Sequence, residues 1–247
     1  MTVLSLRLFS LGAMAACGDL AAAIFTVGSP VGSGQCTHGT IQSAINAAES
    51  SPGADTVRLT RSLTYEPEAV QINTSQHLNV VGGFATCTQT ETDNNYTVVS
   101  GAGGSFAPVL RITIGAGGIV KLRHLTLSGG DALWADNDYG GGIHFRGDGL
   151  LEVIESTISN NAARYGGGIY AEGLGPNAEL LISNNVLIQV NTALYSGGGI
   201  YLDGGKLTMN APDSWIAFNE AQGRRPTGSY YVSGMHSGSC SPAAAVN

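Results

Sequence analysis

The chain has 247 residues, of which 36 are glycine and only 12% are charged, and its formal net charge is −7. This acidic balance, without a cluster of basic residues interleaved with aromatic ones, argues against nucleic acid as a partner. The length is sufficient for one domain.

The start of the chain has the pattern of an export signal. Its first 23 residues are apolar, with one basic residue, Arg7, ahead of the most apolar part, and residues 21–23 are three alanines. We therefore expect residues 1–23 to be a signal peptide. A lipoprotein signal ending before Cys17 is the alternative. The apolar run is too short for a transmembrane anchor, and no later segment approaches the length needed for a membrane-spanning helix.

Residues 36–54 are expected to form an N-terminal cap. Four apolar residues within them share one face of a short amphipathic helix, namely Ile41, Ala44, Ile45 and Ala48. The turn residues 51–55 end this helix. Such a helix would cover the open end of a stack of strands and block edge pairing there.

One disulfide is expected near the same end of the chain. Cys36 and Cys87 flank the N-terminal part and are the natural pair in an oxidising compartment. Cys17 is lost with the leader or carries a lipid, which leaves Cys240 without a partner.

The segment from Tyr139 to Ala221 repeats itself. The string Gly-Gly-Gly-Ile occurs at 140–143, 166–169 and 197–200. A second motif, Ile-x-x-Asn-x-Ala, begins at Ile158, Ile188 and Ile216, and a degenerate copy begins at Leu127. Two motifs kept in phase at a period near 30 residues indicate stacked supersecondary units.

Each unit has the pattern of short strands without room for a helix. Apolar and polar residues alternate in 143–145 and 151–153, and turn residues separate these stretches. We expect about three strands in each unit, which make one triangular coil, with successive coils about 4.8 Å apart. Residues 55–222 would then hold about six coils.

Three sets of repeated residues are expected to stack from coil to coil. The asparagines should occupy corners in the left-handed conformation and form an amide ladder. The tyrosines beside the glycine blocks should form an aromatic ladder, with a carbohydrate-binding platform as the alternative interpretation. The ladder residues are Ile158, Ile188 and Ile216, then Asn161, Asn191 and Asn219, and then Tyr139, Tyr165 and Tyr195.

The glycine block followed by x-x-Asn resembles the repeat of polymorphic outer membrane proteins and related bacterial surface proteins. The resemblance covers roughly residues 120–222, and residues 36–85 resemble the segment that leads into the coils of that family. It implies an all-β fold, a single-stranded right-handed parallel β-helix of the superfold shared with pectate lyases. This chain has isoleucine where the family usually has phenylalanine before x-x-Asn.

The sequence shows no catalytic constellation. Lyases of this superfold need acidic calcium ligands beside an arginine base, and its hydrolases need paired carboxylates. Arg111, Arg123 and Arg146 are scattered, without acidic clusters that align with them. We therefore expect no cofactor and no catalysis.

The densest acidic stretch is Asp131, Asp136 and Asp138. Oxygen ligands at this spacing on a glycine-flanked loop could hold calcium. The interpretation that we favour is a solvated loop with turn residues.

The repeat stops before the C-terminus. After Ala221 the glycine block does not return, and residues 223–247 show no strand alternation, so we expect an irregular or disordered tail. An interrupted stack would leave the last coil open to self-association.

Two functions from different classes fit these patterns. The one that we favour is a secreted or cell-surface β-helix, a non-catalytic adhesin-like binding or structural module, whose partners would be carbohydrate or host-surface ligands. The alternative is a divergent polysaccharide lyase or glycoside hydrolase, which would need a groove with converging carboxylates along one sheet.

Overall fold

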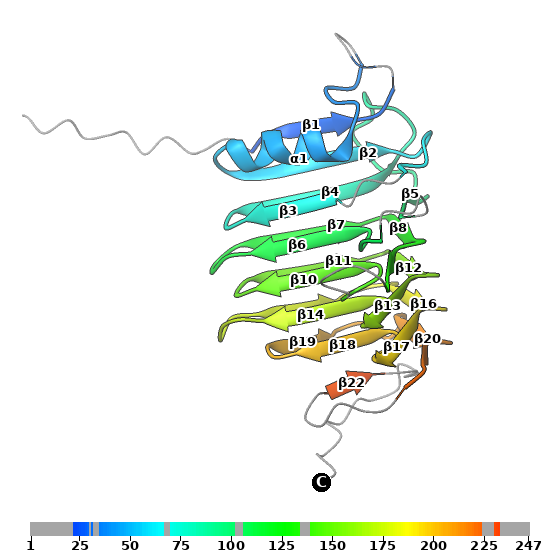
Figure 1. The fold of residues 1–247 in the computed structure, drawn as a ribbon. Coiled ribbons are helices and arrows are strands. Elements are labelled where there is room, and N and C mark those ends of the chain that lie inside the picture. Colours follow the sequence, from blue (N-terminus) through cyan, green and yellow to red (C-terminus); the bar gives the residue numbers. More distant parts are fainter. Residues whose placement is uncertain are drawn as a thin grey trace, which may run out of the picture.

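The computed structural model describes residues 22–29, 31, 35–66, 70–101, 106–133, 139–223 and 230–232. These residues form one helix and four sheets, and within each sheet the short strands are stacked one above another (Figure 1). All but one of the pairings between neighbouring strands are parallel, and that exception lies at the C-terminal end. The arrangement is consistent with a parallel β-solenoid.

Each sheet takes one strand from each successive repeat, in chain order. The first sheet contains β1 (Ile24–Val27), β2 (Ala54–Thr60), β4 (His77–Phe84), β7 (Ile119–Arg123), β11 (Leu150–Ile154), β15 (Glu179–Ile182) and β19 (Lys206–Met209). The second contains β3 (Val70–Thr74), β6 (Leu110–Ile114), β10 (Ile143–Gly147), β14 (Ile169–Gly173), β18 (Ile200–Asp203) and β22 (Tyr230–Val232). The third contains β5 (Thr97–Ser100), β8 (Leu125–Ser128), β12 (Thr157–Ser159), β16 (Leu187–Gln189) and β20 (Trp215–Ala217). The fourth contains β9 (Asp131–Ala132), β13 (Ala162–Tyr165), β17 (Thr192–Ser196) and β21 (Glu220–Ala221).

A complete repeat holds four strands, whereas the sequence pattern predicted about three. The unit that begins at β10 continues through β11, β12 and β13 before the next glycine block. The missed strand, β13, turns only one small residue, Ala163, into the interior. A single alanine gives too weak an alternation of polar and apolar residues to indicate a strand.

The core is a column of aliphatic side chains between the sheets. Equivalent residues of successive repeats face each other, so that Ile158 pairs with Ile188, and Ile188 with Ile216. All three are buried. Each inner strand is therefore hydrogen-bonded along both edges, to the strand above and to the strand below. Its apolar side chains fill the interior.

The N-terminal end is covered by the expected helix. Helix α1 (Ile41–Ser50) packs against β1, β2 and β3, and its four buried residues are the predicted apolar set (Figure 1). The side chain of Thr40 accepts a hydrogen bond from the Ser43 N–H and so caps the helix. The stack begins earlier than expected, because β1 precedes the helix and pairs with β2.

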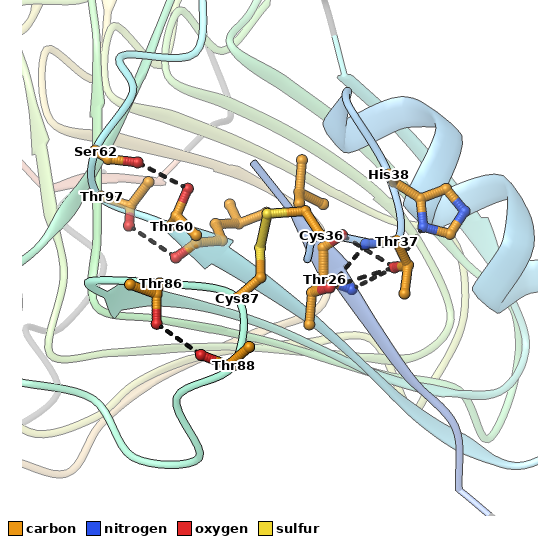
Figure 2. The surroundings of a disulfide bond; sticks show 12 residues. Thr26, Cys36, Thr37, His38, Thr60, Ser62, Thr86, Cys87, Thr88 and Thr97 are labelled. Atoms are coloured by element: carbon orange, nitrogen blue, oxygen red, sulfur yellow. Dashed lines mark hydrogen bonds between the residues drawn. A yellow bond between two sulfur atoms is a disulfide. The ribbon is translucent and has the colours of Figure 1, made fainter. Parts of the chain in front are cut away.

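The predicted disulfide between Cys36 and Cys87 is present (Figure 2). It joins the segment before α1 to the loop after β4, across 51 residues of chain. A Cβ atom on Gly28 would lie 2.7 Å from the Cys36 Sγ, so a side chain there would collide with the bridge. The bridge thus fastens the cap to an early coil.

Part of the C-terminal segment departs from the irregular tail that was expected. Strand β22 pairs antiparallel with β18 and so covers the edge of the second sheet. The edge of β18 offers unpaired backbone groups, and Tyr-Tyr-Val has high strand propensity. In the chain that the structure describes, β19, β20 and β21 are the last strands of their sheets, and self-association there stays a prediction. Within the same residues, no helix is long and apolar enough to cross a membrane.

Candidate functional site

The outer face of the second sheet carries the richest set of polar and aromatic side chains. Residues of β6, β10, β14 and β18 alternate between core and exterior, so that His144 and Arg146 point outward on either side of the buried Phe145. Strand register aligns the outward residues in two columns. One column is Arg111, His144, Tyr170 and Tyr201, and the other is Thr113, Arg146, Glu172 and Asp203.

Left-handed glycines bring a second row of aromatic residues onto this face. Gly140, Gly166 and Gly197 have φ between +62° and +69° and turn the chain from the fourth sheet into the second. A Cβ atom on Gly140 would lie 2.1 Å from the Ile143 carbonyl oxygen, so no other residue fits this turn. Tyr139 therefore lies against His144 and Tyr165 lies against Tyr201, each a residue that directly follows a glycine block.

The two rows interlock as an aromatic cluster. The Tyr139 ring stacks on the Tyr170 ring with centroids 4.5 Å apart, and the Tyr170 ring stacks on Tyr201 at 5.4 Å. The predicted ladder partners are also neighbours, at 5.7 Å for Tyr139 and Tyr165 and 5.2 Å for Tyr165 and Tyr195. Their rings are tilted by about 45° rather than stacked face to face.

The cluster is mostly closed to solvent. Tyr170 and Tyr201 are only 5% exposed, whereas Tyr195 at the rim is 39% exposed. The Tyr170 hydroxyl donates a hydrogen bond of 2.9 Å to the Asp203 Oδ2. Burial and this carboxylate raise the pKa of Tyr170 well above its usual value, so the phenol stays protonated.

A pocket of about 140 Å³ opens beside the cluster, where β6, β10 and β14 lie side by side. Its walls are Arg111, Thr113, Tyr139, His144, Arg146 and Glu172. Other hollows lie beside α1, at Tyr65 and Glu66, and on the first sheet, at Lys121 and Arg123. Neither combines basic, acidic and aromatic side chains as this pocket does.

Charge in the pocket is only partly compensated. The Arg146 Nε lies 3.2 Å from the Glu172 Oε2, which makes an ion pair. Both ring nitrogens of His144 are buried and have no hydrogen-bond partner. Burial, reinforced by the charges of Arg111 and Arg146, lowers the pKa of His144 to about 4, so its ring is neutral at pH 7.

Two carboxylates are neighbours on this face, but each is engaged. Glu172 and Asp203 are register partners on β14 and β18. Glu172 is paired with Arg146, and Asp203 accepts the Tyr170 hydroxyl. Each carboxylate thus already has a partner on this face.

The acidic stretch singled out in the sequence is described only at its first residue. Asp131 lies in β9, and its Oδ1 accepts a hydrogen bond of 3.1 Å from the Leu133 N–H. Asp136 and Asp138 lie outside the described residues. Among the residues that are described, no group of three or more possible ligands could hold a metal ion. Calcium binding there stays a hypothesis.

The asparagines form a continuous amide ladder inside the molecule. The Asn161 Nδ2 donates to the Asn191 Oδ1 at 2.9 Å, and the Asn191 Nδ2 donates to the Asn219 Oδ1 at the same distance. These residues are not themselves left-handed, contrary to expectation. The residue ahead of each takes that conformation, namely Asn160, Val190 and Phe218, with φ between +54° and +57°.

Sequence reasoning missed half of the aromatic cluster. His144, Tyr170 and Tyr201 each follow directly after a Gly-Gly-Gly-Ile block, and this recurrence is the signal that would have found them. Arg111 lies ahead of the first glycine block, so no repeat motif marks it. Comparison of the chain with protein-family models, curated proteins and solved structures gave no match.

Proposed function

We propose that the chain is a right-handed parallel β-helix, exported to the cell surface or secreted, that acts as a non-catalytic, adhesin-like binding or structural module. The observation that carries this proposal is that the repeated residues have structural roles. The isoleucines, asparagines and glycines join one coil to the next, and the carboxylates on the candidate face are held in ion pairs or hydrogen bonds.

Handedness and export rest on separate support. About 98% of the crossover connections between parallel strands of one sheet are right-handed, and every repeat here is such a connection. A disulfide between Cys36 and Cys87 suits an oxidising compartment, as does the apolar leader.

A divergent polysaccharide lyase or hydrolase is the second candidate. One observation favours it: Glu172 and Asp203 are adjacent in register on an outward face, where a polysaccharide could lie across them.

A glycan array beside an assay of bond cleavage separates the two functions. We expect retention of at least one glycan class, without release of reducing ends or unsaturated products from polysaccharides, pectic ones included. The matched variants are Glu172→Gln and Asp203→Asn. Product release by the unaltered chain that these variants abolish would replace the binding proposal with the enzymatic one.

A further inference from the structure

We propose that the pocket between β6, β10 and β14 binds a single negative group carried on a sugar ring, a carboxylate or a sulfate ester. This inference rests on the binding function proposed above and names the class of ligand for it. It starts from Arg111, which lies on β6, the first strand of the candidate face.

Among the lysines and arginines that the structure describes, Arg111 is the one without a hydrogen-bond, ionic or ring partner in that part of the chain. Its counterparts are all engaged: Arg146 with Glu172, Arg123 with Glu155 and Lys121 with Glu152. The same holds for the remaining lysines and arginines that the structure describes. A half-buried guanidinium on a pocket wall is stabilised by an anion that accepts its two parallel N–H groups.

The charge of the pocket selects a single negative charge. Glu172 neutralises Arg146, and His144 is neutral at pH 7, so Arg111 leaves one positive charge uncompensated. A carboxylate or sulfate ester matches that charge. A phosphate monoester carries nearly two negative charges at pH 7 and would leave one of them facing Glu172.

The remaining walls suit a sugar ring rather than a bare ion. Tyr139 lines the pocket with an aromatic ring, a group that packs well against the C–H groups of a sugar, and Thr113 adds a hydroxyl. His144 is 93% buried and borders the pocket, and one of its two unpartnered ring nitrogens could bond to a sugar hydroxyl. The volume of about 140 Å³ admits the anionic group and part of one ring. The rest of the glycan would extend over the outer face of the sheet.

The test is a titration of the full chain with oligosaccharides of equal length. The panel has carboxylate-bearing, sulfated and neutral members, and the binding constants are measured by calorimetry. The variants are Arg111→Gln, Arg111→Lys, which keeps the charge but loses the planar fork, and Lys206→Gln, which removes one positive charge from a mostly exposed ion pair elsewhere.

We expect an acidic class to bind, with an affinity that Arg111→Gln lowers about tenfold or more. The Arg111→Lys variant should lose part of the affinity, and the Lys206→Gln variant should lose almost none. Rising salt concentration should weaken binding. Whether the carboxylate or the sulfated class binds identifies the anion. Should Arg111→Gln fail to fold, the Arg111→Lys variant and the salt series decide the question in its place.

Three outcomes would overturn the inference: no binding of any acidic member, equal binding of neutral members, or acidic binding that Arg111→Gln leaves unchanged. Retention of neutral glycans or of other ligands would then leave the binding module standing. Cleavage of the oligosaccharides would instead remove the proposed function.

Discussion

Burial and nearby positive charge both lower the pKa of His144. Its side chain is almost fully buried. Two positive charges lie near it, Arg111 on β6 and Arg146 on its own strand, and Glu172 on β14 supplies the opposite charge. The pKa of about 4 in the fold lies below the usual 6.5, so the unfolded chain binds a proton more readily than the folded one. Folding stability from this residue is therefore complete above pH 6.5 and is lost as the pH falls toward 4.

We predict that lowering the pH from 7 to 4 reduces the free energy of unfolding by about 3 kcal/mol through the protonation of His144 alone. The variant His144→Tyr, which places the residue of the next two repeats at this position, should flatten the profile by that amount. Urea denaturation at a series of pH values measures it. Identical pH profiles for the two proteins would show that His144 does not titrate as stated.

Val190 occupies a backbone conformation that suits it poorly. It has φ of +54°, and 48% of its surface is exposed, so it gains little from burial. The left-handed conformation costs an ordinary residue about 1–2 kcal/mol, and a β-branched one is a true outlier there.

We predict that Val190→Asn raises the free energy of unfolding by about 1 kcal/mol, because asparagine tolerates this conformation. The matched control is the reverse change one repeat earlier, Asn160→Val, which should lower it by a similar amount. Chemical denaturation measures both. Two shifts of the same sign would mean that the backbone conformation is not what decides stability at this position.

At the residue scale, the sequence predicted the members of the ladders better than their geometry. The isoleucines, asparagines and cysteines recur or pair for a structural reason, so their spacing is visible in the chain. The left-handed position is different, because Asn160, Val190 and Phe218 share a conformation without sharing a side chain. Arg111 could not be singled out either, since only the fold shows that it lacks a partner among the described residues.

The amide ladder is the element-scale feature on which the repeat depends. Asn191 is fully buried, and its Oδ1 accepts from both the Asn161 N–H and Nδ2, while its Nδ2 donates to the Ile158 oxygen. Removing its side chain leaves several buried polar groups unpaired, each at a cost of about 1–3 kcal/mol.

We predict that Asn191→Ala lowers the free energy of unfolding by about 3 kcal/mol or more. Asn219→Ala, at the half-buried end of the same ladder, should cost roughly 1 kcal/mol, because water can replace part of what is lost. Urea denaturation compares the two. Equal losses would indicate that the ladder acts through local turns rather than through its buried hydrogen bonds.

Elements were predictable where the alternation of apolar and polar residues was strong. The helix over 41–50 has four apolar residues on one face, and the inner strands alternate Ile, Leu and Val with polar residues. Strand β13 has only Ala163 to mark it. Strands β1 and β22 pair through their backbones with segments far away in the chain, which no local pattern reveals.

The two ends of the molecule are finished differently. Helix α1 and the disulfide between Cys36 and Cys87 secure the N-terminal coils (Figures 1 and 2). At the other end, β19 has only partly buried or exposed residues, and both residues of β21 are exposed. In a stack where each coil contacts only its neighbours, local stability follows from the interfaces on either side.

We predict that amide hydrogen exchange is slowest in the middle strands β10 and β14 and at least about tenfold faster in β19 and β21, because among the described residues these strands pair with a neighbour on one side only. Reducing the disulfide should accelerate exchange in β1 and α1, by releasing a closed loop of 51 residues, and leave β18 and β19 unchanged. Mass spectrometry of peptic fragments resolves the two ends. Uniform exchange along the chain, or faster exchange at β19 on reduction, would mean that the stack unfolds as one cooperative unit and that neither end can open alone.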